Sequence, residues 1–405
     1  KVTDERDFTV TIRSVIDETE RTIPGTIVGE IRNRPMLPVS RTFVKGVDLF
    51  DGHLSVGATD LQVKGRHFSL NVSRSYSSAG LGEGKSGWTW NYDGVIGRGT
   101  DSGDNGIYSV VTADGSSQKF TKSPTGNAFI PQKGYHTMLT TGGEGELIFI
   151  DKAANRHLFR AESSDTWVSG PWRLVSIEEP HGDVLRVAYN KYGRVDTVRE
   201  YVKGAEKPST TLTFVYEPFR SGPVGERVDP KDVALSEVFA EAANRALNLR
   251  VLYEHFENGE LRKVTRKGTN IGSGKAAEDE VWEYRYTPSS ARDANRLERV
   301  IDPDNRVTRY EFIVGPGFSP SEGEVGDRME FVHKVIQSPG GGLPDVVTEF
   351  DFGPRSSNAA SSTAEVKDPR GNVTKYTMNY HGGVTRIEEP LSRTTSIDWR
   401  QDDAL

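Results

Sequence analysis

One short unit recurs along this chain and constrains its fold more than any other feature. The unit runs from the apolar end of a strand, through an acidic residue beside proline and then a glycine or asparagine, into a strand that carries a tyrosine. Three copies can be placed in register, at residues 177–189, 301–310 and 366–376, and the first half of a fourth begins at residue 387. Such repetition predicts a series of similar β-hairpins.

Turn chemistry accounts for the polar residues of this unit. In the third copy, Asp368, Pro369, Gly371 and Asn372 come directly before the strand that contains Tyr376. Proline holds φ at about −65°, the aspartate can accept hydrogen bonds from the following amides, and glycine or asparagine tolerates a positive φ. The tyrosine offers a large apolar ring and a hydroxyl group. We therefore expect these carboxylates to be structural, with catalysis as the alternative.

Most of the chain between these turns has the alternation of a strand with one buried face. Large apolar residues alternate with polar or small ones at residues 68–72, 185–189, 212–216, 282–286 and 376–380. This period of two predicts a mainly β protein.

One segment has helical spacing instead. Asp229 and Pro230 are suited to the start of a helix, as its cap and its first residue. The residues that follow at helical spacing are Val233, Leu235, Val238, Phe239, Ala242, Ala246 and Leu249. We expect one inserted helix near residues 230–250.

Composition excludes several classes of protein. The chain has 405 residues, which leaves room for one large domain or two to three ordinary ones, and the lack of Met at position 1 suggests a piece of a longer protein. It has 42 glycines, no cysteine and a formal net charge of −7. The absence of cysteine excludes disulfides and thiolate metal sites. The mixed charges argue against a nucleic-acid partner, and no apolar run of about 18 residues predicts a membrane span.

The repeats resemble the tyrosine-aspartate (YD) repeats of Rhs proteins, and an upstream series resembles the module that opens the Rhs repeat region. The residues that match the repeats are Pro180, Tyr189, Gly193, Pro303, Tyr310, Asp368, Pro369, Gly371, Asn372, Tyr376, Tyr380 and Pro390. Those that match the opening module are Asp60, Leu61, Arg74, Tyr76, Ser78, Gly87 and Trp88. The likeness covers residues 46–200 and 281–399. Two features depart from the family pattern: Asn190 and His381 stand where the family usually has aspartate after tyrosine, and residues 201–280 fit poorly.

The resemblance implies a long antiparallel β-sheet ribbon of hairpin repeats that curls into part of a hollow shell, as in teneurin-like proteins. In many Rhs proteins this shell encloses a C-terminal toxin domain, which an aspartyl self-protease releases. The protease signature is not recognisable here, so we expect protease and toxin, if present, to lie beyond Leu405. The implied division is an N-terminal β segment of unknown role (1–45), an opening module (46–120) and a repeat region (121–405) with an insertion at about 201–280.

The expected function is therefore a structural, non-enzymatic shell segment of a secreted or cell-surface bacterial polymorphic toxin. Its partners would be the downstream toxin domain and secretion-system or carrier proteins. Two alternatives remain open. The first is an extracellular adhesion or glycan-binding module, for which Trp88, Trp90, Trp167 and Trp172 would supply exposed aromatic rings. The second is a hydrolase that uses turn carboxylates such as Glu178 with Asp302 as acid and base.

Three further patterns fall short of ligand motifs. The glycines of residues 82–87 match a dinucleotide-binding spacing, but Trp88 and Trp90 follow where a helix should begin. Residues 269–276 lack the first glycine and the final serine or threonine of a phosphate-binding loop, and residues 101–106 lack the closing glutamate of a calcium loop. We expect no metal and no cofactor.

Overall fold

The computed structural model describes most of the chain, and all structural statements below concern these residues. They are 6–13, 20–27, 42–64, 69–78, 87–100, 106–111, 117–123, 128–131, 136–161, 171–220, 232–243, 245–268, 278–289, 294–317, 326–353, 361–379 and 382–399. Contacts divide the chain into two compact units. The first unit comprises residues 1–56, 76–87 and 284–404, and the second comprises residues 57–75 and 88–283.

The described residues are mainly β, as the alternating pattern predicts. They contain no α-helix, and a short 3-10 turn, η3 (Pro390–Ser392), lies between β29 and β30. No helix in this part of the chain has the length and apolar character needed to cross a bilayer.

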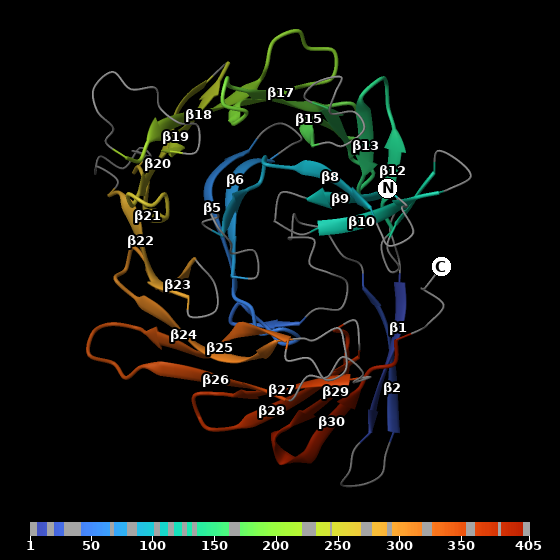
Figure 1. Cartoon of the computed structure of the whole chain (residues 1–405), viewed down its shortest axis with the longest axis vertical. Helices are drawn as coiled ribbons and strands as arrows, with labels where there is room; N and C mark the ends of the chain where they lie inside the picture. Colours follow the sequence, from blue (N-terminus) through green and yellow to red (C-terminus); the bar gives the residue numbers. More distant parts are fainter. Residues whose placement is uncertain are drawn as a thin grey trace. The chain divides into compact units, whose positions relative to one another are not determined.

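The second unit contains a long antiparallel sheet in which strands adjacent in sequence are paired. From β15 to β22 each strand pairs with the next one along the chain, and Figure 1 shows β17 to β21 following one another in this order. The strands are β5 (Ser55–Lys64), β6 (Ser69–Ser77), β7 (Trp88–Trp90), β8 (Val95–Thr100), β9 (Gly106–Val111), β10 (Ser117–Lys122), β11 (Phe129–Pro131), β12 (Met138–Thr141), β13 (Glu146–Ile150), β14 (Arg156–Ala161), β15 (Trp172–Glu178), β16 (Val184–Tyr189), β17 (Val195–Tyr201), β18 (Thr210–Pro218), β19 (Val233–Ala242), β20 (Arg245–His255), β21 (Leu261–Arg266) and β22 (Glu280–Pro288). The strands β5, β6 and β22 extend across the boundary into the first unit.

At β15 the sheet branches. This strand pairs with β14 along its length, while its first residues pair with β8 and its last residues pair with β16. The inner side chains of this region form an aromatic core, in which Tyr108 contacts the rings of Phe129 and Trp172 and Phe120 contacts Phe149. Burial of these large rings, at about 25 cal/mol per Å² of apolar surface, is the main force that holds the strands together here.

The first unit has the same organisation. From β23 to β30 each strand pairs antiparallel with the next one along the chain, and the N-terminal hairpin adds β1 to the edge of β30. The strands are β1 (Arg6–Arg13), β2 (Glu20–Ile27), β3 (Phe43–Val44), β4 (Val47–Asp48), β23 (Asn295–Ile301), β24 (Val307–Gly317), β25 (Gly326–Ser338), β26 (Val346–Phe352), β27 (Ser361–Lys367), β28 (Val373–Asn379), β29 (Val384–Glu389) and β30 (Arg393–Ser396).

The prediction of a helix near residues 230–250 is wrong, because the apolar residues from Val233 onward lie in the strands β19 and β20. Asp229 and Pro230, expected to start the helix, lie outside the described residues. The reason is a β-bulge. Val215 is opposite Glu237 and Tyr216 is opposite Leu235, so Ser236 is an extra residue, and its hydroxyl donates to the carbonyl of Val215 at 3.1 Å. The bulge shifts the alternation by one residue. The buried positions therefore fall at residues 233, 235, 238 and 240, and the step of three residues from Leu235 to Val238 is one that a helix face also has.

Candidate functional site

The repeating unit of the sequence is a turn with one constant hydrogen-bonding pattern. The first residue of the turn donates its N–H to the carbonyl four residues later at 2.8–3.1 Å, and the fourth residue donates back to the first at 2.9–3.0 Å. The fourth residue always has a positive φ, between 60° and 94°. In the described residues this pattern occurs seven times, starting at Asp151, Glu179, Asn190, Phe256, Asp302, Asp368 and Asn379.

Five of these turns also use the side chain of their first residue: in the turn that begins at Asn379, its side-chain oxygen accepts the N–H of Gly383 at 2.9 Å, and in the other four the oxygen accepts two N–H groups. One side-chain oxygen accepts the N–H groups two and four residues later, at 2.8–3.2 Å, in the turns that begin at Asp151, Asn190, Asp302 and Asp368. Hydrogen bonds from the Asn372 side chain and from the backbone amides of Asn372 and Arg370 lower the pKa of Asp368. Asn190 makes the same two contacts as the aspartates, because an amide oxygen accepts hydrogen bonds as a carboxylate does.

Most residues that match the repeats lie in or beside these turns. Gly193 and Gly371 take the positive φ, and Pro180, Pro303, Pro369 and Asn372 lie within the turns. The tyrosines have different surroundings. Tyr310 is buried in β24, Tyr376 is half-buried in β28, and the hydroxyl of Tyr189 donates to the carbonyl of Leu174 at 2.6 Å. Pro390 begins η3, and Tyr380 lies outside the described residues.

Two turns of this type were not anticipated from the sequence, those beginning at Asp151 and Phe256. The first could have been found, because Asp151 and Asn155 have the same spacing as Asp368 and Asn372, and in both turns the asparagine amide also donates to the aspartate. The second has no acidic first residue. Only the pair of Asn258 and Gly259 marks it, and such a pair is common in turns of many kinds.

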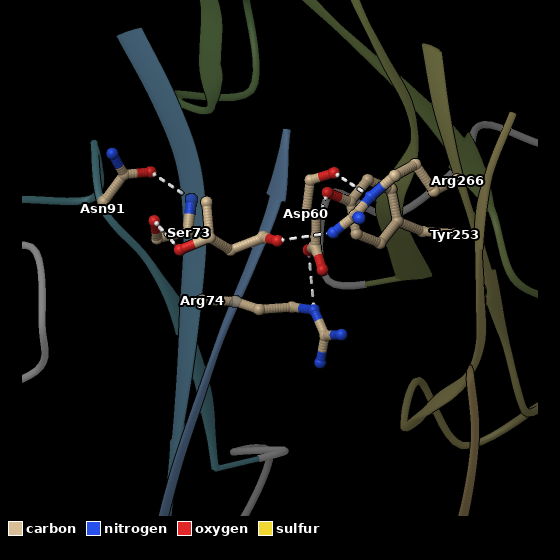
Figure 2. Close-up of polar contacts among 7 residues, drawn as sticks. Asp60, Ser73, Arg74, Asn91, Tyr253 and Arg266 are labelled. Atoms are coloured by element: carbon tan, nitrogen blue, oxygen red, sulfur yellow. Dashed lines mark hydrogen bonds and ion pairs between the residues drawn. The ribbon is translucent and has the colours of Figure 1, made fainter. Parts of the chain in front are cut away.

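Asp60 and Arg74, two of the residues matched to the opening module, belong to a buried polar cluster in the second unit, on the hairpin of β5 and β6 (Figure 2). The Nε atom of Arg74 lies 2.7 Å from the Oδ2 atom of Asp60, and each residue is 2% exposed. The hydroxyl of Tyr253, from β20, donates to the same oxygen at 3.0 Å. The guanidinium of Arg74 also lies over the ring of Trp88, 4.6 Å from its centre.

The backbone beside this ion pair is held as well. Arg266, from β21, donates to the carbonyls of Asp60 at 2.9 Å and Thr59 at 2.8 Å. Figure 2 shows Arg74 approaching Asp60 from one side, with Arg266 and Tyr253 on the other. Burial and the neighbouring charge of Asp60 raise the pKa of Tyr253 well above its ordinary value, so its hydroxyl remains a donor.

This cluster fastens the hairpin to the sheet. A charge pair shielded from water costs desolvation, and here the carboxylate has two donors while the arginine has an ion pair and an aromatic ring. Because Asp60 and Arg74 are almost fully covered, a substrate cannot reach them. The resemblance to the opening module singles out Asp60, Arg74 and Trp88, whereas Tyr253 and Arg266 lie far along the chain and carry no recognisable signal.

The remaining residues of the opening module are structural too. Leu61 is 5% exposed in the core. Tyr76, which is fully buried, accepts the N–H of Leu297 at 2.8 Å, and Ser78 accepts the N–H of Leu54 at 2.8 Å; both pairs lie within the first unit. Gly87 has a φ of 77° and accepts the N–H of Ser77.

The carboxylates considered for hydrolysis have structural contacts. Asp302 accepts two amides of its own turn, and Glu178 lies at the end of β15, opposite Val184. Side chains of metal-ligand type gather elsewhere, at Asp48, Asp51 and His53 in the first unit.

No family model matches this chain, and no curated protein matches it. Several solved structures do, and two of them illustrate the likeness. One is a Photorhabdus luminescens Tc holotoxin pore with a mutated TccC3, with 11% identity, a TM-score of 0.39, and coverage of 90% of this chain and 24% of that chain. The other is the TcdB2-TccC3 crystal structure, with 13% identity, a TM-score of 0.32, and coverage of 85% of this chain and 20% of that chain. The chain therefore spans a quarter or less of either protein, and a likeness of this degree assigns it no function.

Proposed function

We propose that this chain is a wall segment of a β-shell in a secreted bacterial Rhs-type polymorphic toxin, and that the shell encloses a C-terminal toxin domain located beyond Leu405. The observation that carries the proposal is the turn repeated at seven places, which joins strands that are adjacent both in sequence and in the sheet. Together with the YD-type residues at these turns, it supports a ribbon that grows by one hairpin at a time.

A ribbon of this kind is suited to enclosure. The backbone groups of each strand are hydrogen-bonded to its neighbours, so the wall exposes few unpaired edges. Such a wall needs no catalytic or ligand-binding residues. Solvent-accessible pairs of opposite charge bridge successive strands of the second unit, such as Glu237 with Arg250 and Glu254 with Arg262. A comparable bridge in the first unit joins Glu349 to Lys367. They give the sheet a hydrated polar face.

The proposed role is non-enzymatic. The partners are the toxin domain of the same polypeptide and the secretion-system or carrier proteins that export it, and the location is extracellular or on the cell surface. The chain's net charge of −7 agrees with the absence of a nucleic-acid partner in this region.

The glycan-binding alternative loses part of the feature that motivated it. Trp88 and Trp172, expected to be exposed, are 6% and 3% exposed, and Trp90 is half-buried and in edge-to-face contact with Tyr253. Trp167 lies outside the described residues. A buried indole ring cannot stack on a sugar, so the shell is the function we retain.

The test uses the complete parent polypeptide. Its products of limited proteolysis are separated by native size exclusion and identified by intact mass. We expect a fragment downstream of residue 405 to co-elute with this region and to resist protease until the complex is denatured. A parallel sample, denatured before protease is added, should lose the downstream fragment. If the native sample loses it equally fast while residues 46–405 survive, the enclosure proposal is wrong.

A further inference from the structure

The last described strand of the first unit, β30, is covered along one edge by β29. The contact continues past the end of the strand. There the N–H of Ile397 donates to the carbonyl of Thr385 at 2.8 Å. The indole N–H of Trp399 donates to the carbonyl of Val384, also at 2.8 Å. A further strand can therefore pair with β30 at its opposite edge alone.

The opposite edge of β30 is occupied by the N-terminal strand β1. Thr11 lies opposite Ser396 and Ile12 lies opposite Thr395, in an antiparallel pairing. From β23 to β30 each strand is antiparallel to the strand before it. The next strand of such a ribbon would lie on this edge of β30 and run in the direction that β1 has. The strand β1 therefore takes the place of a further ribbon strand.

The second strand of the N-terminal hairpin lies at the outside of this sheet. β2 pairs with β1 along eight residues, from Arg6 opposite Ile27 to Arg13 opposite Glu20 (Figure 1). In the part of the chain that the structure describes, no second strand pairs with β2. An unpaired edge exposes a row of N–H and C=O groups that can recruit a strand from another molecule. The outer edge of β2 is therefore where a second copy of this chain could attach.

The sequence of β2 makes this outer edge a poor acceptor. Pro24 lies in the middle of the strand, opposite Thr9, and Gly25 follows it. Proline has no N–H, so within sheets it is found on edge strands, where the missing donor faces away from the paired neighbour. Glycine in a strand interior weakens the strand further. An incoming strand would find a donor missing at the centre of this edge.

We propose that the hairpin of β1 and β2 is an edge cap, in which β1 fills the strand-accepting edge of β30 and Pro24 in β2 prevents pairing with a second copy of this chain. The proposal gives a role to residues 6–27, for which the sequence indicates none. It goes beyond the proposed shell function and does not depend on a toxin domain.

The absence of cysteine from the sequence allows engineered disulfides to test the pairing of β1 with β30 in the full chain. Thr11→Cys combined with Ser396→Cys places thiols on opposed residues, whose Cα atoms lie about 5 Å apart, a distance that a disulfide spans. Thr11→Cys combined with Thr394→Cys is the matched control, because a shift of two residues separates the Cα atoms by about 8 Å. Under mild oxidation, we expect the opposed pair to form an intramolecular disulfide at least about tenfold faster than the shifted pair.

A third pair, Glu388→Cys with Thr394→Cys, is opposed across β29 and β30 and reports whether β30 is formed. A disulfide in this pair, without one between residues 11 and 396, overturns the proposal because β30 is then formed and left uncovered. Disulfides from residue 11 to residue 396 that join two molecules also overturn it, because β1 then covers β30 of a second copy. Mass spectrometry of the non-reduced chain distinguishes these outcomes.

The role of Pro24 is tested by restoring the missing donor. Pro24→Thr adds an N–H to the outer edge of β2, together with a residue that favours strands. Thr26→Val is the control, because it changes a side chain of the same strand and no backbone donor. In sedimentation velocity over a range of protein concentrations, we expect concentration-dependent dimers for Pro24→Thr and none for Thr26→Val or the wild type. If Pro24→Thr sediments as the wild type does at every concentration, Pro24 does not protect the edge and the proposal is overturned. Loss of enclosure in the proteolysis test would change neither result.

Discussion

At the residue scale, the fourth position of each repeated turn requires a backbone conformation with a positive φ, and it requires no side-chain contact. Gly371 has a φ of 86°, and a Cβ atom added there would meet nothing within 4 Å. Ala154 occupies the equivalent position of another turn with a φ of 64°. The conformation favours glycine at both positions, although the space would accept a side chain.

Replacing Gly371 with alanine and replacing Ala154 with glycine should therefore change the free energy of unfolding in opposite directions. We expect Gly371→Ala to lower the free energy of unfolding by about 1 kcal/mol and Ala154→Gly to raise it by about 0.5 kcal/mol, because only the first substitution introduces backbone strain. Gly97→Ala is the control, since Gly97 also has open space but lies in β8 without a positive φ. Chemical denaturation measures all three. Equal effects at Gly371 and Gly97 would contradict the turn assignment.

At the element scale, the bulge at Ser236 decides which face of β19 is buried. Val233 and Leu235 before it and Val238 and Ala240 after it all lie on the inner face. Removing the extra residue would restore a regular strand with the same residues buried, whereas removing a residue from a regular ladder turns half of the strand outward.

We expect deletion of Ser236 to preserve a folded chain with a modestly lower unfolding temperature. Deletion of Thr213, in the regular part of β18, should cost about 3 kcal/mol or more, because either Leu212 or Phe214 would lose its buried position. Circular dichroism during thermal unfolding compares the two deletions. Deletions of equal severity would show that the bulge is itself required.

The attachment of the β5–β6 hairpin to β20 and β21 also belongs to this scale. Replacing Asp60 with asparagine keeps the shape but removes the negative charge that faces the buried guanidinium of Arg74, which should cost about 3–5 kcal/mol. Tyr253→Phe removes one hydrogen bond from an intact ion pair and should cost about 1 kcal/mol.

Glu365→Gln provides the comparison for a solvent-exposed pair. Its partner is Lys375, and both side chains are more than 40% exposed, so we expect a change below about 1 kcal/mol. Urea denaturation measures the three variants. If Asp60→Asn were as mild as Glu365→Gln, the cluster would not hold the hairpin to the sheet.

At the scale of the whole molecule, buried ionisable groups link folding to pH. Burial in β20 lowers the pKa of His255 to about 4, from its ordinary value of 6.5. Between these two values the unfolded chain binds a proton that the folded chain does not. Stability therefore falls as the pH is lowered from about 6.5 to 4 and shows no further loss from this group below that range.

His255→Gln should remove this contribution, which amounts to at most about 3 kcal/mol at the acid end of the range. The free energy of unfolding, measured by denaturation between pH 7 and pH 4, should fall less steeply in this variant than in the wild type. His181→Gln, in an exposed turn, should follow the wild-type curve. Parallel curves for His255→Gln and the wild type would contradict a neutral, half-buried imidazole.

The sequence alone determined the turns and the β character of this protein. Asp368, Gly371 and Asn372 act on each other across four residues, so their chemistry is visible in a short stretch, and Asn190 replaces an aspartate without changing the pattern. Tertiary structure decided what depends on distant partners. The spacing of apolar residues after Val233 fits both a helix and a bulged strand, and only pairing with β18 selects the strand. In the same way, the sequence around Asp60 does not indicate that Tyr253 and Arg266 contact it, because burial and ion pairing arise where remote strands meet.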